Sequence, residues 1–356
     1  MNEPAESRLA AAVHHLPPGY FALVMATGII SLGFHLRGFE MLSLPMLVIA
    51  AAAYVVLVVM LVWRLVRYPR AVLKDLASPH HGFAFFTFVA GTNVLGARLA
   101  AQGVDTLPAV MLGVSFTAWL ILGYAIPGLV VNTHPGDDLL RGMNGTWFIW
   151  SVASQSVAVM AAGLQPNAGV MANALSIVAI LSWGIGVILY AVIGVAVVIR
   201  VLTRGIPPEE MGPPYWVTMG AGAITVLAGS RIVEMDGTPM VTVMRAPVAA
   251  AAVVFWAFCT WLIPALFGIG YWRHFMRKVP LRYEPGLWSM IFPLGMYSVA
   301  GIYLGRADAL PIVGWIGANF LWLALTAWFI VFVAMVVHLL RAARAPRAVA
   351  APSVAP

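Results

Sequence analysis

The sequence predicts an all-helical integral membrane protein of ten transmembrane helices, paired as five hairpins around a common axis. Three observations predict it. The chain of 356 residues is 62% hydrophobic and only 9% charged, whereas soluble domains carry roughly a quarter charged residues. Ten apolar runs approach or exceed the roughly 20 residues that a bilayer crossing needs. Every second run begins with a similar segment, at a near-constant spacing.

The ten runs alternate between two kinds. Odd-numbered spans are shorter and carry Gly, Pro, Ser, Thr and aromatic residues, whereas even-numbered spans are longer and rich in Leu, Val, Ala and Trp. In chain order the spans are expected at 17–36, 43–63, 82–99, 106–131, 144–163, 170–199, 214–232, 246–272, 286–304 and 311–338. They divide the chain into an N-terminal tail at 1–15, a membrane domain at 16–340 and a disordered basic tail at 341–356.

The odd spans form an internal repeat. They open with PGYFALVMATG, HGFAFFTFVAG, NGTWFIWSVAS, PPYWVTMGAGA and PGLWSMIFPLG, and the second residues of these segments are 63, 63, 69 and 72 residues apart. Nine positions further on, each repeat has a small residue: Gly28, Gly91, Ser154, Ala223 and Gly295. Parallel repeats imply a symmetry axis along the membrane normal. Five odd helices are therefore expected inside and five even helices outside.

The distribution of basic residues predicts the orientation. If the N-terminus is cytoplasmic, inner loops and tails hold 15 of the 20 Lys and Arg residues, and outer loops hold five. Such an excess predicts that both termini lie in the cytoplasm and that the protein spans the inner membrane. The net charge of +7 therefore reflects topology rather than nucleic-acid binding. The N-terminus lacks the features of a cleaved signal peptide. The single cysteine, Cys259, lies in an apolar run, so neither a disulfide nor a thiol metal site is expected.

The small residues and helix breaks of the odd spans predict a central pore. Small residues let membrane helices pack closely, but helix breaks such as Pro293 are tolerated where the backbone lines a cavity. Polar residues in or beyond the middle of the odd spans are candidates to line the pore: Thr27, Thr92, Asn93, Ser154, Gln155, Thr225 and Ser298. Each hydroxyl could equally bond to a neighbouring helix or to its own. No acidic or basic residue lies in the middle of an odd span, which favours passive permeation over coupled transport.

Basic residues at the outer ends of four repeats favour anions over cations. They lie 16 to 20 residues after the repeat starts: Arg37, Arg98, Arg231 and Arg306. Rings of arginine favour anions, although anchoring to lipid headgroups is an alternative. Three acidic residues would partly offset the charge: Glu234, Asp236 and Asp308. Basic residues within 273–282 add a basic inner mouth.

A gate in the pore is predicted from the layer of residues that lies six positions after the second residue of each repeat segment. This layer contains Met25, Phe88, Ser151, Gly220 and Phe292. Phe292, with Phe88 as a second constriction, would close a narrow lumen by excluding water. Pro293 frees a backbone carbonyl directly after Phe292 and favours a bend there. Packing of each ring between helices is the alternative.

Three segments resemble the tellurite-resistance/dicarboxylate transporter family, which includes the plant slow-type anion channels. They are PPGYFALVMATGI in the first span, NGTWFIWSVASQSVAV in the fifth and WSMIFPLGMYSVAG in the ninth. The resemblance covers nearly the whole chain. It implies five hairpins with quasi-fivefold symmetry, a homotrimer with one pore per protomer, and a pore occluded by the phenylalanine at Phe292. It also implies anionic substrates: halide, nitrate, dicarboxylates, sulfite or tellurite.

Other functions remain open at this stage. A proton-coupled transporter of C4-dicarboxylate, sulfite or tellurite could use the same scaffold, but all eight histidines lie at span ends or in loops. A haem enzyme would need facing histidines at depth, and none are evident. The hydrolase motifs H-E-x-x-H and G-x-S-x-G are absent from the sequence. We therefore expect no enzyme activity and no cofactor.

Overall fold

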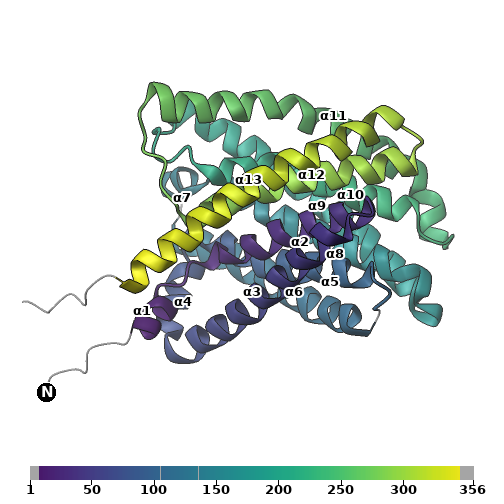
Figure 1. Cartoon of the computed structure of the whole chain (residues 1–356), viewed down its shortest axis with the longest axis horizontal. Helices are drawn as coiled ribbons and strands as arrows, with labels where there is room; N and C mark the ends of the chain where they lie inside the picture. Colours follow the sequence, from purple (N-terminus) through teal and green to yellow (C-terminus); the bar gives the residue numbers. More distant parts are fainter. Residues whose placement is uncertain (1–7, 105, 135, 345–356) are drawn as a thin grey trace, which may run out of the picture.

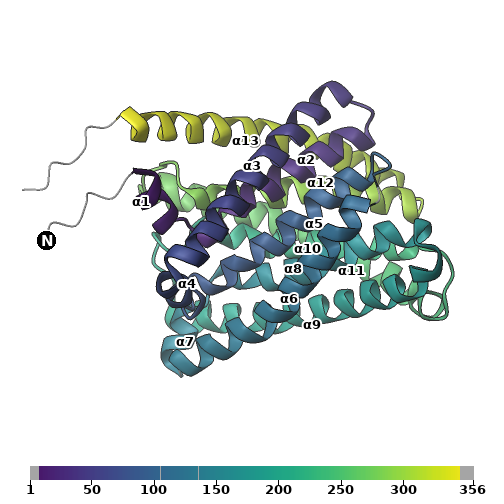
Figure 2. The same ribbon diagram turned by 90° about the horizontal axis from the view of Figure 1, so that it is seen from below.

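The computed structural model describes residues 8–104, 106–134 and 136–344, and in this part ten helices are long and apolar enough to cross a membrane. These described residues contain no β-strand. The prediction of an all-helical membrane protein with ten spans is thereby confirmed. The helices form one bundle, and the first helix and the end of the last lie at the same end of it (Figures 1 and 2).

The odd-numbered spans are the short, buried helices. Their bounds are α2 (Ala22–Leu36), α5 (Phe86–Ala100), α8 (Phe148–Leu164), α10 (Val217–Val233) and α12 (Trp288–Ala307). Between 78% and 89% of the residues in the most apolar stretch of each odd span are buried inside the protein. We call these five the inner helices.

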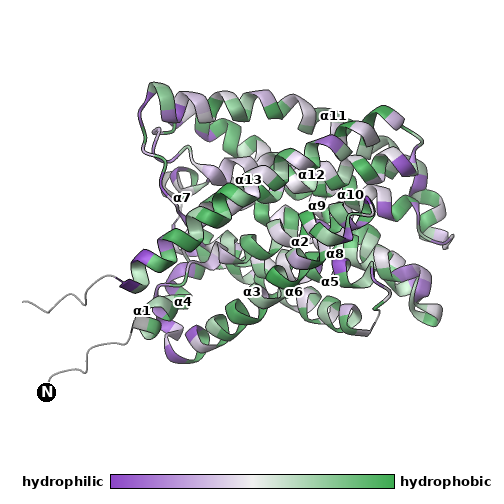
Figure 3. Ribbon diagram, in the orientation of Figure 1, coloured by the Kyte–Doolittle hydropathy of each residue, from purple (hydrophilic) through white to green (hydrophobic). Residues whose placement is uncertain are grey.

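The even-numbered spans are longer and cover the inner helices. Their bounds are α3 (Glu40–Arg67), α6 (Thr106–Thr133), α9 (Ala172–Arg204), α11 (Pro239–Tyr271) and α13 (Pro311–Arg344). Only 17% to 28% of the corresponding stretches are buried, and their exposed faces carry Val, Ile, Leu, Phe and Trp side chains. Hydrophilic residues gather toward the two ends of the bundle (Figure 3). These outer helices have the apolar surface that contact with lipid requires.

Several boundaries differ from the expectation. The outer helices extend beyond the uncharged runs; α11, for example, begins at Pro239 rather than near 246. Short helices α4 (Pro69–Leu76) and α7 (Asp137–Gly142) lie between spans, and α1 (Arg8–His14) lies within the expected N-terminal tail. Of the expected C-terminal tail, residues 341–344 continue α13, and 345–356 lie outside the described residues.

Each repeat start folds into the same local structure. A single 3-10 turn precedes each of the five inner helices: Pro18–Phe21, Gly82–Phe85, Gly145–Trp147, Pro213–Trp216 and Pro285–Leu287. Proline fits the first turn of a helix because its missing N–H has no partner there in any case. Glycine allows close approach: a Cβ atom on Gly145 would lie 2.1 Å from the Pro214 carbonyl oxygen. The Pro/Gly pattern therefore marks contacts between consecutive turns.

The inner helices touch one another in a closed order. Contacts run from α2 to α5, α8, α10 and α12, and return from α12 to α2. The five 3-10 turns make contacts in the same order, with the turn at Pro285–Leu287 meeting the turn at Pro18–Phe21. The contacts among the inner helices thus close on themselves, and we call the line that these helices enclose the axis.

Candidate functional site

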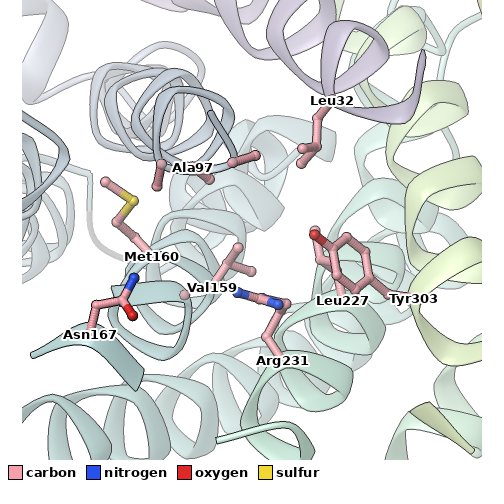
Figure 4. Close-up of a pocket in the computed structure, with 11 residues that line it drawn as sticks. Leu32, Ala97, Val159, Met160, Asn167, Leu227, Arg231 and Tyr303 are labelled. Carbon is pink, nitrogen blue, oxygen red and sulfur yellow. The ribbon is translucent and has the colours of Figure 1, made fainter. Parts of the chain in front are cut away.

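A cavity of about 190 Å3, which we call the mouth cavity, lies at the C-terminal ends of the inner helices (Figure 4). Every inner helix contributes to its wall, and so does the loop that follows α8. The lining residues are Leu32, Ala97, Ala100, Ala101, Val159, Met160, Gly163, Asn167, Leu227, Arg231 and Tyr303. A cavity with walls from all five inner helices lies on their common axis.

A second cavity, the axial cavity, continues from the mouth cavity deeper into the bundle. The two share Leu32, Ala97, Val159 and Leu227, and the axial cavity adds Ile29, Asn93, Val94, Ser156, Ile224 and Met296. Its volume is only about 10 Å3, which is close to the minimum for a single water molecule. The open space on the axis therefore narrows sharply and becomes mostly apolar.

Phe292 lies on the face of α12 that lines this axis. It precedes Met296 by one helical turn, and Met296 precedes Tyr303 by two, so the three side chains share one face. Phe292 is 1% exposed. The next residue, Pro293, packs against Gly220 of α10, where a Cβ atom would lie 2.7 Å from the Pro293 Cγ atom. Phe292 is not among the residues that line either cavity; helical spacing places it one turn before Met296, beside the close contact between Pro293 and Gly220.

Phe88 lies elsewhere. Its ring packs edge to face on Phe21, with 5.4 Å between the ring centroids, and belongs to an apolar cluster that includes Leu57 of α3. Ser151, from the same expected layer, donates a hydrogen bond of 2.8 Å to the Gly186 carbonyl on α9. The residue six positions after the repeat start therefore does not lie on the same face in every inner helix.

The polar candidates mostly bond to outer helices instead of lining the axis. Thr27 accepts a hydrogen bond from the Trp328 indole at 2.9 Å, and Ser154 accepts one from the Trp119 indole at 2.9 Å. Thr92 pairs with Tyr54, Gln155 donates to the Trp183 carbonyl, and Ser298 donates to the Gly317 carbonyl. The Thr225 hydroxyl donates instead to the Ala221 carbonyl of its own helix, and its backbone carbonyl accepts from the Trp183 indole. Unsatisfied polar groups are costly in a membrane interior, so these bonds hold inner and outer helices together.

The partners on the outer helices form a repeat of their own. One aromatic residue per hairpin packs on the inner helix of the next hairpin: Tyr54, Trp119, Trp183, Trp256 and Trp328. They are 65, 64, 73 and 72 residues apart, nearly the spacing of the inner repeat. Trp256 differs, because it stacks on Tyr297 and its indole nitrogen has no hydrogen-bond partner in the described part of the chain.

The polar groups on the axis are Asn93 and Ser156. The Asn93 amide donates to the Ser156 hydroxyl at 3.0 Å and accepts from Ser115 at 2.6 Å. Asn93 is one of the candidates from the sequence, whereas Ser156, Met296 and Tyr303 are not. All three occupy positions that other lining residues share. Ser156 and Asn93 both lie eleven residues after their repeat starts, and Met296 lies ten residues after its start, as Ile29 and Ile224 do. Tyr303 and Arg231 both lie seventeen residues after theirs.

The small residues lie between neighbouring inner helices. A Cβ atom on Gly28 would be 3.1 Å from Val94 of α5, and one on Gly295 would be 2.8 Å from Ile29 of α2. Gly91 faces Phe21 in the same way, and Ala223 of α10 is 1% exposed. Close approach at these positions keeps the space on the axis narrow.

The four arginines at the outer ends occupy three different environments. Arg231 lines the mouth cavity, with 2.7 Å between its Nη1 and the Glu234 carboxylate. Arg98 is fully buried between α2, α3 and α5, where it donates to the hydroxyls of Ser31 and Ser43. The other two are exposed: Arg306 donates to the Leu36 carbonyl, and Arg37 lies over the Phe39 ring. Only Arg231 therefore brings a positive charge to the cavity wall.

Other charges lie away from the cavity. Desolvation by partial burial raises the pKa of the Asp308 carboxyl, which lies in the turn between α12 and α13. At the opposite end, Arg273 donates to the carbonyls of Pro208 and Glu209 and thus joins two loops. Within the described ranges, no three His, Cys, Asp or Glu side chains come together to hold a metal ion.

Comparison with known proteins finds membrane proteins and transporters. An uncharacterized membrane protein of Mycobacterium tuberculosis is 54% identical over 151 residues, which cover 42% of this chain and 77% of that protein. An uncharacterized transporter of Methanocaldococcus jannaschii is 21% identical over 333 residues, covering 90% and 94%. A sulfite efflux pump of Arthroderma benhamiae is 21% identical over 350 residues, covering 90% of each chain.

The match to a family model covers most of the chain. The model of the voltage-dependent anion channel family, SLAC1, matches residues 15–336, which include all ten spans except the last residues of α13. This match confirms the resemblance that the first, fifth and ninth spans predict. The chain belongs to the SLAC1 voltage-dependent anion channel family.

Proposed function

We propose that this protein is a passive anion channel or facilitator whose pore runs along the axis of the inner helices and is gated by Phe292. The observation that carries the proposal is the position of Phe292 on the α12 face that also lines the mouth and axial cavities. An aromatic ring in a narrow apolar segment excludes water, and an anion cannot cross such a segment without its hydration.

The proposed pore has quasi-fivefold symmetry. This is supported by the closed order of contacts among the inner helices and among the 3-10 turns, together with the repeated aromatic residue on the outer helices. The small residues Gly28, Gly91, Ser154, Ala223 and Gly295 let the helices approach closely enough for one ring to close the lumen. Pro293 removes a hydrogen-bond donor beside that ring and gives α12 a point at which it can bend.

The proposed substrates are small inorganic anions or dicarboxylates. Arg231 supplies a positive charge at the mouth, and none of the described residues that line the two cavities is acidic. No lining residue apart from Arg231 and Tyr303 is ionisable, which favours passive flux over coupling to protons. The second candidate is a proton-coupled transporter of C4-dicarboxylate, sulfite or tellurite, and the relative named a sulfite efflux pump favours it.

The proposed setting is the inner membrane, with both termini in the cytoplasm and the mouth cavity facing outward. The excess of basic residues in the inner loops supports this orientation. We further propose a homotrimer with one pore in each protomer, on the strength of the family resemblance.

The test is halide flux into proteoliposomes for the wild type, Phe292→Ala and Phe88→Ala. Removal of the Phe292 ring is expected to raise the flux at least about tenfold, since each ~1.4 kcal/mol taken from a barrier gives a factor of ten. Phe88→Ala is the matched control, because it removes the same atoms from a ring that packs on Phe21. It should leave the flux unchanged.

Two outcomes would contradict the proposal. Folded protein with no halide flux in either the wild type or Phe292→Ala would exclude a passive channel. Dicarboxylate or sulfite uptake that requires a pH gradient would then establish the second candidate. An equal rise in both variants would instead assign the gate to general loosening of the bundle.

A further inference from the structure

We propose that the mouth cavity is a binding site for small monovalent inorganic anions, in which Glu234 competes with the anion for Arg231. The inference deepens the proposed function and rests on it, since it names the class of anion that the pathway selects. Halides, nitrate and hydrogensulfite belong to this class. It starts from the cavity wall, where hydrogen-bond donors are present and acidic residues are absent among the described lining residues.

Three side chains supply the donors. The Arg231 guanidinium and the Tyr303 hydroxyl point into the cavity, and the Asn167 amide lies at its edge (Figure 4). A guanidinium carries five N–H groups, of which one binds Glu234. The Tyr303 hydroxyl forms no hydrogen bond with any described residue, although its ring lies 5.3 Å from the Arg231 guanidinium carbon. These unused donors come from α10, α12 and the loop after α8, so an anion between them would join three elements.

Gly163 leaves room for the guanidinium. A Cβ atom at this position would lie 3.4 Å from the Arg231 Nη2 atom, an ordinary contact distance, so the guanidinium lies directly against this glycine. The Tyr303 ring holds the guanidinium from the other side by a cation–π contact. The charged group is therefore positioned before any anion arrives, which reduces the entropy lost on binding.

Glu234 makes the site selective for low charge. Its carboxylate lies 2.7 Å from Arg231 at the end of α10, and its side chain is 35% exposed. An entering anion takes over donors of Arg231, while the carboxylate turns toward solvent and remains nearby. The attraction to Arg231 and the repulsion from this carboxylate both double for a dianion, so their small net attraction can only double as well. The cost of removing the ion from water rises with the square of its charge, which makes it about four times as large for a dianion. One guanidinium opposed by one carboxylate thus suits a monovalent anion and releases it readily.

The test is anion binding to the purified protein, which does not depend on flux. A ligand that binds the folded state raises the unfolding temperature with its concentration. Nitrate and succinate are titrated at constant ionic strength with the wild type, Arg231→Gln, Glu234→Gln and Arg306→Gln. We expect a saturable shift with nitrate and none with succinate. Arg231→Gln should raise the half-saturating nitrate concentration at least about tenfold, and Glu234→Gln should lower it several-fold.

Arg306→Gln is the matched control. Arg306 is also a basic residue at the outer end of an inner helix, but it is exposed and binds the Leu36 carbonyl outside the cavity. Its variant should behave as the wild type. Equal effects of Arg231→Gln and Arg306→Gln would overturn the site, and a succinate shift equal to that of nitrate would overturn the monovalent class. Absence of flux in Phe292→Ala would overturn the channel and leave this binding result intact.

Discussion

Glycine has different surroundings around the axis and on the surface that faces lipid. In the turn that opens α8, a Cβ atom on Gly145 would lie 2.1 Å from the backbone of the next turn, at Pro214. On the exposed side of α6, a Cβ atom on Gly113 would meet no atom within 4 Å. The same residue type is thus required for backbone contact around the axis and is free of contacts where the surface faces lipid. The two sets of helices thus differ in exposure as well as in composition.

The largest effect that would test this comparison is expected from Gly145→Ala. The added methyl group meets a backbone carbonyl, which cannot rotate away as a flexible side chain can. Overpacking of this kind costs about 3 kcal/mol or more. Gly113→Ala is the matched control, and it should lose nothing, because alanine favours a helix over glycine. The measurement is the temperature at which each detergent-solubilised variant loses its monodisperse elution peak.

Equal stability of the two glycine variants would break the comparison. It would mean that the closed order of the 3-10 turns tolerates an extra atom at its tightest contact. The symmetry of the proposed pore would then lose its main structural support.

An intermediate effect is expected from the aromatic residues that join the two sets of helices. Trp183→Phe removes the hydrogen bond from the indole to the Thr225 carbonyl, which measures 3.2 Å. Trp256→Phe removes the same atoms, but the Trp256 indole nitrogen has no partner among the described residues. We expect Trp183→Phe to lose about 1 kcal/mol more than Trp256→Phe, in line with hydrogen bonds within membranes.

The measurement is the difference between the unfolding free energies of Trp183→Phe and Trp256→Phe. Both leave a similar gap in the packing, so the gap largely cancels between them. If the two lose the same stability, the repeated aromatic residues act through packing alone.

The sequence predicts the two sets of helices because each leaves a local signal. Long uninterrupted apolar runs mark α3 and α13, while Pro and Gly at constant spacing mark the turns that open the inner helices. The repeated outer aromatic residues carry a signal of equal quality, since counting from Tyr54 to Trp119 and Trp183 would have found them. That count would have assigned Thr27 and Ser154 to helix contacts rather than to the axis.

The lining of the cavities leaves a weaker signal. Ile29, Ile224 and Met296 lie ten residues after their repeat starts, and Asn93 and Ser156 lie eleven residues after theirs, but hydrophobicity does not mark these positions. Burial on all sides makes the inner helices weakly amphipathic, so the sequence does not distinguish the face toward the axis from the face toward an outer helix. Asn93 lines the axial cavity while the adjacent Thr92 bonds to Tyr54. Arg98 and Arg231 have similar positions in their repeats, yet one is buried between helices and the other reaches the mouth cavity. Such differences arise from packing between helices distant in sequence.

The smallest effect is expected where an inner helix turns into an outer one, at Asp308. Desolvation raises the pKa of this carboxyl in the folded protein above its value in the unfolded chain. The folded state therefore binds the proton more tightly, and the carboxylate destabilises the fold at neutral pH. This destabilisation decreases as the pH is lowered through the pKa of Asp308, which lies above the usual aspartate pKa of about 4.

Asp308→Asn removes the charge at every pH and should be slightly more stable than the wild type at pH 7. The advantage should shrink on acidification toward pH 4, because the wild-type carboxyl then becomes neutral as well. The measurement is the unfolding temperature of both proteins across this range. An advantage for the wild type at pH 7 would mean that the charged carboxylate is held by a stabilising interaction. The turn would then resemble the inner helices, whose polar side chains are held by hydrogen bonds, rather than the exposed faces of the outer helices.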